Sequence, residues 1–304
     1  MEALRISNIV KTHNKGKVLA VEDVSFAVEK GEMFGLIGPD GAGKTTLFRI
    51  LTTLLLADKG SATVAGFDVV KDYKAIRGIV GYMPGRFSLY QDLTVEENLR
   101  FFATVFNTTI AENYHLIRDI YVQLEPFKDR RAGKLSGGMK QKLALCCALI
   151  HKPEVLFLDE PTTGVDVMSR KEFWDMLKRL QKEGITVLVS TSYMDEATLC
   201  DRIGLIQEGK LLSVDTPENI IRHYPGTLYA IKAGAPYKLL KDLYAFPEMA
   251  DSYSSGEYVH FLFKNHDAAS QRRLMEYLQQ RGHTDVVMKE TIPTVEDCFI
   301  RLLK

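Results

Sequence analysis

The sequence lacks any long hydrophobic run. The longest stretch, LALCCALI at residues 143–150, is eight residues long, whereas a helix that spans a bilayer needs about 20 apolar residues. The first ten residues, MEALRISNIV, also lack a basic region followed by an apolar core, so we expect no export signal. Both absences predict a cytoplasmic protein. Any role at a membrane would require another polypeptide that spans the bilayer.

An excess of charge of one sign is also missing. The 39 lysine and arginine residues are balanced by 39 aspartate and glutamate residues. A strongly basic surface is the electrostatic footprint of proteins that bind nucleic acid or anionic lipid. The balance therefore argues against nucleic acid as a partner.

Cysteine is scarce and shows no functional spacing. The four cysteines are Cys146, Cys147, Cys200 and Cys298, and their intervals match no common metal or redox motif. Cys146 and Cys147 are adjacent inside an apolar run. This placement predicts buried free thiols in a reducing compartment.

The residues that are present predict an α/β fold. Of the 304 residues, 46% are hydrophobic, which is enough to bury the core of one large or two ordinary domains. Residues 4–37 alternate between β-rich runs and polar turns. Later, EVLFLDE (154–160) and ITVLVST (185–191) are short aliphatic runs between helical patterns. Such runs are typical of parallel strands that are covered on both faces.

Three helical patterns separate the β-rich start from the aliphatic runs. Thr94 and Glu97 form a capping-box pattern at the start of TVEENLRFFATVF. A second helix is expected at about 111–124 and a third near Ser136. The sequence thus predicts a helical insert within an α/β domain.

The composition shifts at residues 223–236, HYPGTLYAIKAGAP. Beyond it, TLYAIKA, YVHFLFK and TDVVMKE resemble strands, and 237–246 and 268–282 resemble helices. Residues 226–304 therefore predict a small second α/β domain. Its last helix is expected to begin with a Thr294–Asp297 cap and to place five apolar residues on one face. These are Val295, Cys298, Phe299, Leu302 and Leu303.

The strongest motif is GPDGAGKT, residues 38–45, which matches G-x-x-x-x-G-K-[ST] between an apolar strand and the helix KTTLFRIL. Its glycines let successive backbone N–H groups point at a phosphate, and the helix N-terminus adds positive potential. Lys44 can reach the β- and γ-phosphates, and the Thr45 hydroxyl can bind Mg²⁺. The residues predicted to bind ATP here are Gly38, Pro39, Asp40, Gly41, Ala42, Gly43, Lys44, Thr45 and Thr46.

The strand end VLFLDE adds two carboxylates. Asp159, at the end of a buried strand next to the phosphate loop, is placed to hold Mg²⁺ directly or through water. Glu160 follows it and is predicted to lie near the γ-phosphate as a base or water-orienting group. Alone, an apolar run that ends in Asp-Glu is an ordinary strand end, and it gains meaning only beside the motif at 38–45.

The segment LSGGMKQ at residues 135–141 predicts a second anion site. Ser136 is a natural N-cap, and Gly137 and Gly138 expose N–H groups at a helix start. One nucleotide does not need two phosphate-binding helix ends in one chain. We therefore expect two such domains to face each other, each lending its Ser-Gly-Gly to the nucleotide of its partner.

These motifs resemble the ATP-binding cassette family, the motor subunits of ABC transporters, over roughly residues 4–222. The resemblance rests on GPDGAGKT, LSGGMKQ, Asp159-Glu160 and TTGVD at 162–166. It implies a P-loop NTPase cassette core (residues 1–222) with an N-terminal antiparallel β-subdomain and an inserted helical subdomain at about 88–150, followed by a small C-terminal α/β domain (226–304).

The resemblance also implies how such a protein works. Two cassettes form a head-to-tail homodimer or heterodimer with two ATP molecules between phosphate loop and signature, and Asp166 helps to couple the two sites. The helical subdomain contacts separately encoded transmembrane permease subunits, which places the chain on the inner face of the cell membrane. The ending TIPTVEDCFIRLLK resembles the tail of drug-resistance-type exporter cassettes, although a plain dimerisation or stability module is the alternative.

Three residues depart from the family pattern. Gly85 in GYMPGRF stands where a glutamine contacts Mg²⁺ and senses the membrane partner, and Gln91 lies too far along the chain to replace it. His13 stands where an aromatic residue stacks on adenine, a role that imidazole can fill more weakly, or it is an exposed loop histidine. Ser192 replaces a histidine that binds the γ-phosphate and can donate only one uncharged hydrogen bond.

The sequence therefore predicts an ATPase that powers a transporter, most simply an exporter, with Glu160, Lys44 and Ser192 in catalysis. Gly85 and Ser192 leave three possibilities open: slow turnover, a site that works beside a more complete site on a partner cassette, or ordinary turnover because nearby groups compensate. The alternatives are a weakly hydrolysing regulatory cassette and a soluble cassette that serves ribosomes or DNA. The second is disfavoured by the single copy of each motif and the absence of heptads or cysteine clusters.

Overall fold

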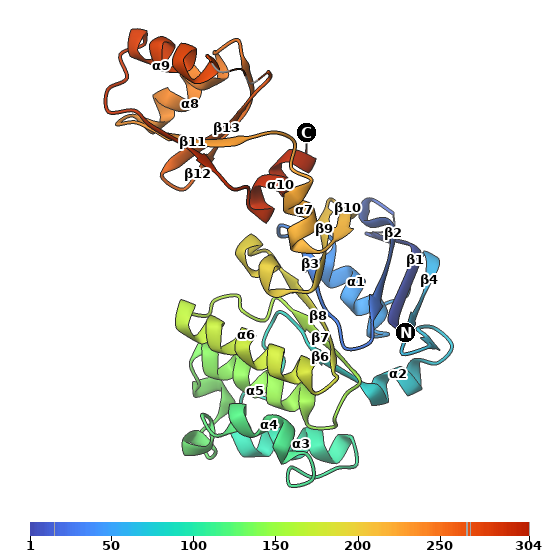
Figure 1. Cartoon of the computed structure of the whole chain (residues 1–304). Helices are drawn as coiled ribbons and strands as arrows, with labels where there is room; N and C mark the ends of the chain where they lie inside the picture. The colour runs from blue at the N-terminus through green and yellow to red at the C-terminus, as the bar shows by residue number, and fades with distance from the viewer. Residues whose placement is uncertain (15, 266, 268, 304) are drawn as a thin grey trace. The chain divides into compact units, whose positions relative to one another are not determined.

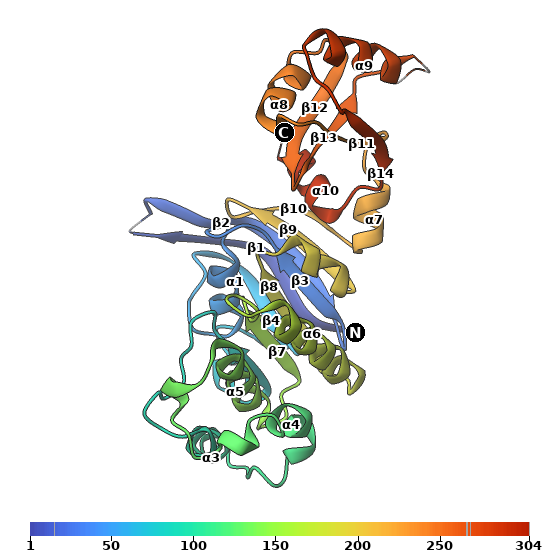
Figure 2. The same cartoon turned by 90° about the vertical axis from the view of Figure 1, so that its left-hand side faces the viewer.

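The computed structural model describes residues 1–14, 16–265, 267 and 269–303. The chain divides into two compact units, Met1–Ile220 and Ile221–Lys304, whose elements are labelled in Figures 1 and 2. The sequence placed the end of the first domain at residue 222, whereas the division of the structure falls inside helix α7 (Pro217–Arg222). Within the described ranges, no helix is both long and apolar enough to cross a bilayer.

The first unit begins with an antiparallel sheet whose strands are in the order β2-β1-β4-β5. Its strands are β1 (Glu2–His13), β2 (Val18–Glu29), β4 (Lys59–Val64) and β5 (Phe67–Asp68). Buried and exposed residues alternate along much of β1 and β2, the period of a sheet with one face in the core. Residues 4–37 thus contain the expected antiparallel part, except that the run at 33–37 joins a different sheet.

The second sheet has the order β10-β9-β3-β8-β7-β6. Its strands are β3 (Met33–Ile37), β6 (Val80–Met83), β7 (Val155–Asp159), β8 (Thr186–Thr191), β9 (Arg202–Gln207) and β10 (Lys210–Asp215). All neighbouring pairs are parallel except β9 with β10. Every residue of β3, β7 and β8 is buried, which confirms the two parallel strands expected from their aliphatic runs.

Most helices of the first unit lie in the connections between strands of this sheet. Between β6 and β7 the chain forms α3 (Val95–Val105), α4 (Tyr114–Tyr121) and α5 (Gly137–Leu149), with short 3-10 turns at Glu125–Phe127 and Ala132–Lys134. Thr94 caps α3 in a capping box with Glu97, as the sequence predicts. The other helical elements are α1 (Lys44–Leu51), α2 (Tyr73–Ile79), α6 (Val167–Lys182) and the 3-10 helix Met194–Leu199.

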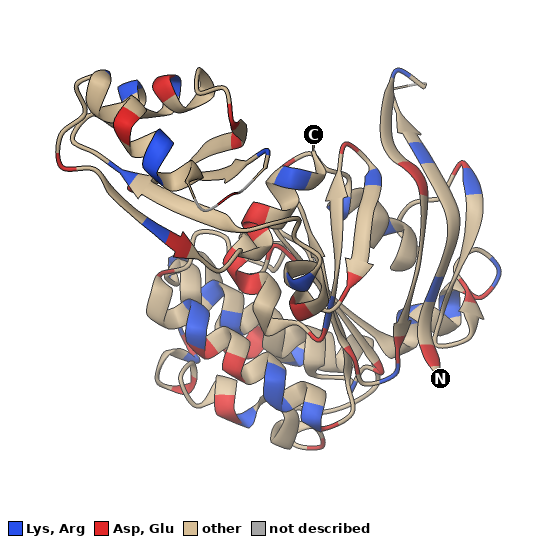
Figure 3. Ribbon diagram, turned by 45° about the horizontal axis from the view of Figure 1, so that its top comes forward, with Lys and Arg blue, Asp and Glu red and all other residues tan. Residues whose placement is uncertain are grey.

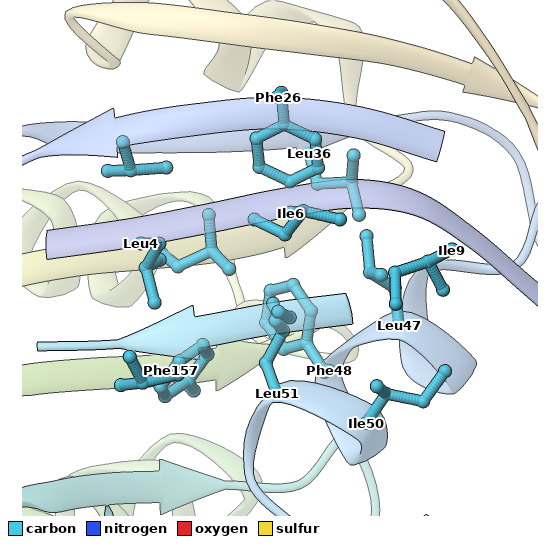
Figure 4. Packing of buried hydrophobic residues seen from close by; sticks show 14 of the residues in the cluster. Leu4, Ile6, Ile9, Phe26, Leu36, Leu47, Phe48, Ile50, Leu51 and Phe157 are labelled. Carbon is cyan, nitrogen blue, oxygen red and sulfur yellow. The ribbon is translucent and has the colours of Figure 1, made fainter. Parts of the chain in front are cut away.

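One hydrophobic core of the first unit lies between its two sheets. Figure 4 shows side chains of β1 and β2 meeting those of α1 and β7. Phe48 on α1 packs edge-to-face on Phe157 of β7, with ring centroids 5.9 Å apart. Because α1 starts at Lys44, burial of its apolar face fixes the residues just before it against the sheet.

The second unit has the order β-α-β-β-α-β followed by a final helix. Its elements are β11 (Leu228–Lys232), α8 (Pro236–Tyr244), β12 (Met249–Ser255), β13 (Tyr258–Phe263), α9 (Ser270–Gln280), β14 (Val287–Thr291) and α10 (Val295–Leu302). The strand order β12-β13-β11-β14 gives this unit the ferredoxin-like arrangement. A separate core includes Tyr229, Phe261 and Leu274.

The last helix differs from the prediction at its end. Thr294 and Asp297 form the expected capping box, and Val295, Cys298 and Phe299 are buried. Leu302 and Leu303, which were expected on the same apolar face, are 44% and 47% exposed. They lie in the last turn of α10 and at its C-cap. All four cysteines of the chain are buried, as the sequence predicts, and Cys146, Cys147 and Cys200 are free thiols.

Candidate functional site

The predicted phosphate loop joins β3 to α1. A Cβ atom on Gly38 would lie 2.1 Å from the carbonyl oxygen of Ile206, and one on Gly43 would lie 2.2 Å from that of Ala20. Gly43 also has a φ of 102°, in the left-handed region. Only glycine fits at these two positions, because neighbouring backbone occupies the space of a side chain.

Lys44 brings two predicted site residues together. Its Nζ donates to the carbonyl oxygens of Gly38 (2.6 Å) and Pro39 (3.0 Å) inside the loop. The same ammonium group lies 2.9 Å from Oε1 of Glu160, and its side chain is only 4% exposed. A charge this well buried requires such partners. Lys44 thus links the Glu160 carboxylate directly to the phosphate loop.

Asp159 and Glu160 follow the buried strand β7 as expected. Asp159 is 1% exposed, and its Oδ1 accepts a hydrogen bond of 2.6 Å from the Ser190 hydroxyl on the neighbouring strand β8. The N–H of Glu160 donates to both the carbonyl (3.0 Å) and the hydroxyl (3.1 Å) of Ser190. Glu160 has a φ of 51°, in the left-handed region that residues with a side chain uncommonly adopt.

Two further hydroxyls contact the Glu160 carboxylate. Its Oε2 accepts from Thr163 at 3.0 Å and from Ser192 at 3.4 Å. Ser192 thus faces the carboxylate that the sequence assigned to hydrolysis. The structure therefore brings Lys44, Asp159, Glu160 and Ser192 to one place, at the carboxyl ends of three parallel strands, where ligands bind in such sheets.

The negative charge of Asp159 also reaches Tyr82 on β6. Burial raises the pKa of Tyr82 to about 12, the charge of Asp159 adds to this rise, and Arg49 opposes it. The Tyr82 hydroxyl is therefore a neutral neighbour that stays protonated at physiological pH.

Gly85 lies beside the two acidic residues. A Cβ atom at this position would be 3.1 Å from the carbonyl oxygen of Asp159 and 3.6 Å from Cβ of Glu160. A longer side chain here would therefore start next to the backbone of Asp159 and the base of the Glu160 side chain. Gln91 lies elsewhere, because its carbonyl accepts from the N–H of Gly133 at 2.9 Å.

The donor set suits Mg²⁺ only together with phosphate oxygens. Within residues 1–14, 16–265, 267 and 269–303, no group of three or more His, Cys, Asp or Glu side chains is placed to hold a metal ion. Thr45, in the first turn of α1, and Asp159 offer one hydroxyl and one carboxylate, the oxygen chemistry that Mg²⁺ prefers. These residues fit a metal ion that takes its remaining ligands from a nucleotide and water.

His13 and Asp40 lie at the edges of the loop. The Nε2 of His13 is 3.2 Å from the hydroxyl of Thr46 in the first turn of α1. The histidine is thus tied to the helix that follows the phosphate loop. Asp40 is exposed to solvent, so its carboxylate is hydrated rather than buried among the groups that would bind phosphate.

The Ser-Gly-Gly segment forms a separate feature. Ser136 caps α5 by accepting from the N–H of Met139 at 3.4 Å, and Ser136 and Gly137 are exposed. A Cβ atom on Gly138 would lie 3.5 Å from the Ser169 hydroxyl, next to the Asp166 cap of α6. Among the described residues, no hydrogen bond or ion pair joins residues 136–138 to Lys44, Asp159 or Glu160.

Two residues of the site were not predicted. Ser190 hydrogen-bonds Asp159, and the buried Glu196 accepts hydrogen bonds from Thr162 and Thr191. Of the three hydroxyl residues at 190–192, the sequence assigned a role only to Ser192. The available signal was the alternation of a strand, which places Ser190 and Ser192 on the same side.

With this geometry established, comparison with known proteins decides the family. A family model described as ABC transporter matches residues 21–163. The Nod factor export ATP-binding protein I of Rhizobium sp. (strain N33) is 36% identical over 291 residues, which are 94% of this chain and 93% of that protein. The chain belongs to the ABC transporter family. This cassette therefore has the fold that its motifs indicated.

Other relatives differ in how much of their length the cassette spans. The doxorubicin resistance ATP-binding protein DrrA of Mycobacterium tuberculosis is 38% identical over 230 residues, covering 75% of this chain and 69% of that protein. The probable multidrug ABC transporter ATP-binding protein YbhF of Escherichia coli is 41% identical over 290 residues. The cassette spans 49% of YbhF, about half its length.

Solved structures of cassettes share the fold of the first unit. One, described as the ATP-binding subunit of an ABC transporter, is 27% identical, with a TM-score of 0.66 over 73% of this chain and 93% of that chain. Another, cbiO1 from Clostridium perfringens, described as part of the complex cbiONQ, is 25% identical with a TM-score of 0.64. It covers 73% of this chain and 91% of that one.

Proposed function

We propose that this cassette is the ATP-hydrolysing motor subunit of an ABC exporter that works with separate transmembrane subunits. The observation that carries the proposal is the 2.9 Å contact between Lys44 and Glu160. It links the phosphate loop to a carboxylate that has two further hydroxyl donors. A strand-end carboxylate beside a phosphate loop is the arrangement that phosphoryl transfer to water requires.

Each residue has a distinct role in this proposal. Lys44 neutralises charge on the β- and γ-phosphates, and the loop N–H groups hold their oxygens. Thr45 and Asp159 would hold Mg²⁺, which supplies electrostatic stabilisation of the transferred phosphoryl group. Asp159 is already oriented for this role by the Ser190 hydroxyl.

Glu160 would orient and deprotonate the attacking water. Its side chain is only 16% exposed, and its carboxylate is held by Lys44, Thr163 and Ser192. When phosphates take over the Lys44 ammonium, Oε1 of Glu160 becomes free to accept a proton from water. Ser192 is positioned to donate one hydrogen bond, to Glu160 or to a phosphate oxygen.

A second copy of the cassette would complete the site. Ser136 and Gly137 are exposed at the start of α5, so they are available to a nucleotide bound on another molecule. Val167 and Met168, just after the Asp166 cap, are 77% and 68% exposed. Apolar side chains this exposed next to a functional segment support an association surface at this edge.

Transmembrane subunits would dock in an apolar groove of the first unit. The groove has a volume of about 430 Å³ and is lined by the end of β6, α3 and α5, including Met83, Phe106 and His151. Leu54 and Val105, at its lining, are 57% and 55% exposed. We assign it to a short amphipathic helix of the membrane partner. Leu54→Asp and Val105→Asp should abolish co-purification with that partner without changing hydrolysis by the isolated cassette.

The direction of transport rests on the relatives. The similar proteins include a doxorubicin resistance protein, Nod factor export proteins and a linearmycin resistance protein. We therefore assign this cassette to export. Charge supports a protein partner rather than nucleic acid, since lysine and arginine are interleaved with aspartate and glutamate on the helices of the first unit (Figure 3).

A weakly hydrolysing regulatory cassette is the second candidate. Gly85 leaves no side chain beside Asp159, and Ser192 offers a neutral hydroxyl 3.4 Å from Glu160. Both reduce the polar contacts available to a γ-phosphate and its water. This candidate predicts tight nucleotide binding with slow turnover.

Steady-state Mg-ATP hydrolysis by the purified chain separates the two candidates. A motor should turn over readily, and Glu160→Gln should lower kcat by roughly 100-fold or more, since general bases contribute about 10²–10⁴-fold. The exposed Glu183→Gln serves as the matched control and should have no effect. If wild type binds ATP but scarcely hydrolyses it, and Ser192→His raises the rate, the regulatory candidate is correct.

A further inference from the structure

The first unit contains a buried carboxylate that the proposed hydrolytic roles do not use. Glu196 lies in the 3-10 helix Met194–Leu199 and is 1% exposed. Its Oε1 accepts from the Thr162 hydroxyl at 2.7 Å, and its Oε2 accepts from the Thr191 hydroxyl at 2.6 Å. Each oxygen therefore holds a different segment of the chain.

The two segments are those that carry Glu160 and Ser192. Thr162 follows Glu160 by two residues, and Thr191 directly precedes Ser192. Thr191 also accepts from the N–H of Tyr193 at 3.0 Å, so its hydroxyl fixes the turn that contains Ser192. Direct contact between Glu160 and Ser192 is long, at 3.4 Å. Glu196 thus adds a buried side-chain link to the backbone hydrogen bond that the N–H of Glu160 donates to Ser190.

A neighbouring arginine also lies close to the Glu196 carboxyl group. The Nε of Arg170 lies 3.7 Å from Oε1, and the Arg170 guanidinium stacks over the ring of Tyr193 at 4.0 Å. That nitrogen makes no hydrogen bond within the described part of the chain. The two hydroxyl contacts are short, at 2.7 and 2.6 Å, and buried from water, so the two threonines are held firmly.

We propose that Glu196 is a positioning residue for hydrolysis, which holds the segment after Glu160 and the segment at Ser192 in one fixed relation. The inference rests on the proposed ATPase function. Glu196 does not contact the reacting atoms. It sets the distance between the carboxylate and the hydroxyl that do, and rates fall steeply when such groups are misplaced by about 1 Å.

The first test compares neighbouring acidic residues. Glu196→Gln keeps the shape but weakens both hydroxyl contacts, and we expect it to lower kcat by roughly 10- to 100-fold while KM for ATP changes less than about two-fold. Asp195→Asn is the matched control. Asp195 also pairs with Arg170, at 3.8 Å, but it is 75% exposed and contacts neither threonine. Equal losses in both variants would overturn the proposal.

If Glu196→Gln fails to fold, serine and valine variants of Thr162 and Thr191 provide a second test. Thr162→Ser and Thr191→Ser retain the hydroxyl and should keep near wild-type kcat, whereas Thr162→Val and Thr191→Val remove it and should lose rate. Equal activity of the valine and serine variants contradicts the proposal.

Hydrogen exchange separates the positioning role from the proposed function. In Glu196→Gln, backbone amides at 160–165 and at 191–193 should exchange at least several-fold faster than in wild type, with unchanged exchange in β7. Unchanged exchange at both segments overturns the positioning role, whatever the activity. A wild-type chain that hydrolyses no ATP refutes the proposed function itself, and hydrolytic positioning falls with it.

Discussion

The hydroxyl groups of Ser190, Thr191 and Ser192 are consecutive in the sequence, yet each donates to a different carboxylate. The acceptors are, in order, Asp159, Glu196 and Glu160. Alternation along the strand explains the division, because Ser190 and Ser192 share one side and Thr191 takes the other. The three hydroxyls at the end of this buried strand thus each bind one specific carboxylate.

Ser190 gives the first prediction at this scale. Ser190→Ala removes the hydroxyl that donates to the buried Oδ1 of Asp159. Outer contacts of metal-binding side chains are typically worth 10- to 100-fold in metal affinity or activity. We expect the Mg²⁺ concentration for half-maximal ATP hydrolysis to rise roughly 10-fold.

Ser192→Ala is the comparison for this experiment. Ser192 contacts Glu160 and not Asp159, so its loss should change kcat with little change in the Mg²⁺ requirement. If both variants shift the Mg²⁺ dependence equally, Ser190 does not orient Asp159 specifically.

The sequence predicted the site residues that belong to motifs. It did not predict the residues that hydrogen-bond those site residues and the segments that bear them. Lys44, Asp159, Glu160 and Ser192 lie in recognisable patterns, and the structure brings them together. Ser190 and Glu196 act across segments about 30 residues apart in the chain. Such contacts depend on the pairing of β7 with β8, which no local pattern encodes.

At the level of elements, caps were easier to predict than polar strands. The capping boxes at Thr94 and Thr294 are both present, since they depend on two residues three positions apart. Strand β12, MADSYSS, has no β-rich composition and was not predicted. It forms because β13 offers a hydrogen-bonding edge, with Ser252 opposite Phe261. Strand formation of this kind is set by the neighbouring strand.

The N-terminal turn of α10 gives a pH prediction. Burial by itself raises the pKa of Asp297, but hydrogen bonds from His260, Thr294 and Tyr253 outweigh it and lower the pKa to about 2, from an ordinary 3.8. Asp297 therefore stabilises the second unit fully above about pH 4. That stability should disappear as the pH falls from 4 to 2, because the carboxylate is then protonated.

Urea unfolding followed at several pH values between 5 and 2 tests this prediction. Wild type should lose on the order of 1–2 kcal/mol across this window through Asp297, and Asp297→Asn should lack that part of the loss. Glu296→Gln changes the neighbouring exposed carboxylate and should behave like wild type. An identical pH profile for Asp297→Asn and wild type would contradict the assignment.

At the scale of the whole molecule, the two units have separate hydrophobic cores. Only the first contains the residues proposed to bind nucleotide. A ligand that binds one folded unit stabilises that unit by about 2.7 kcal/mol at 100 times its Kd. We expect Mg-ATP to raise the unfolding temperature of the first unit and to leave that of the second unchanged.

The single tryptophan makes this measurable in the full chain. Trp174 lies on α6 in the first unit, so its fluorescence reports that unit while calorimetry reports both. The Glu160→Gln variant should show the nucleotide-dependent shift without consuming ATP, and Lys44→Ala should show none. One cooperative transition that shifts as a whole would show instead that the units unfold together.

The helical insert leaves the parallel sheet after β6 and returns at β7, and these two strands are neighbours. Because its two ends are adjacent, this insert can change in length and sequence without any change in the order of the strands that bear Asp159 and Ser190. Apart from the segment 136–138 that it carries, the insert can therefore alter the surface proposed to meet the membrane partner while Lys44, Asp159 and Glu160 stay in place. Exchange of this insert between related cassettes should therefore change which transmembrane subunits the cassette binds.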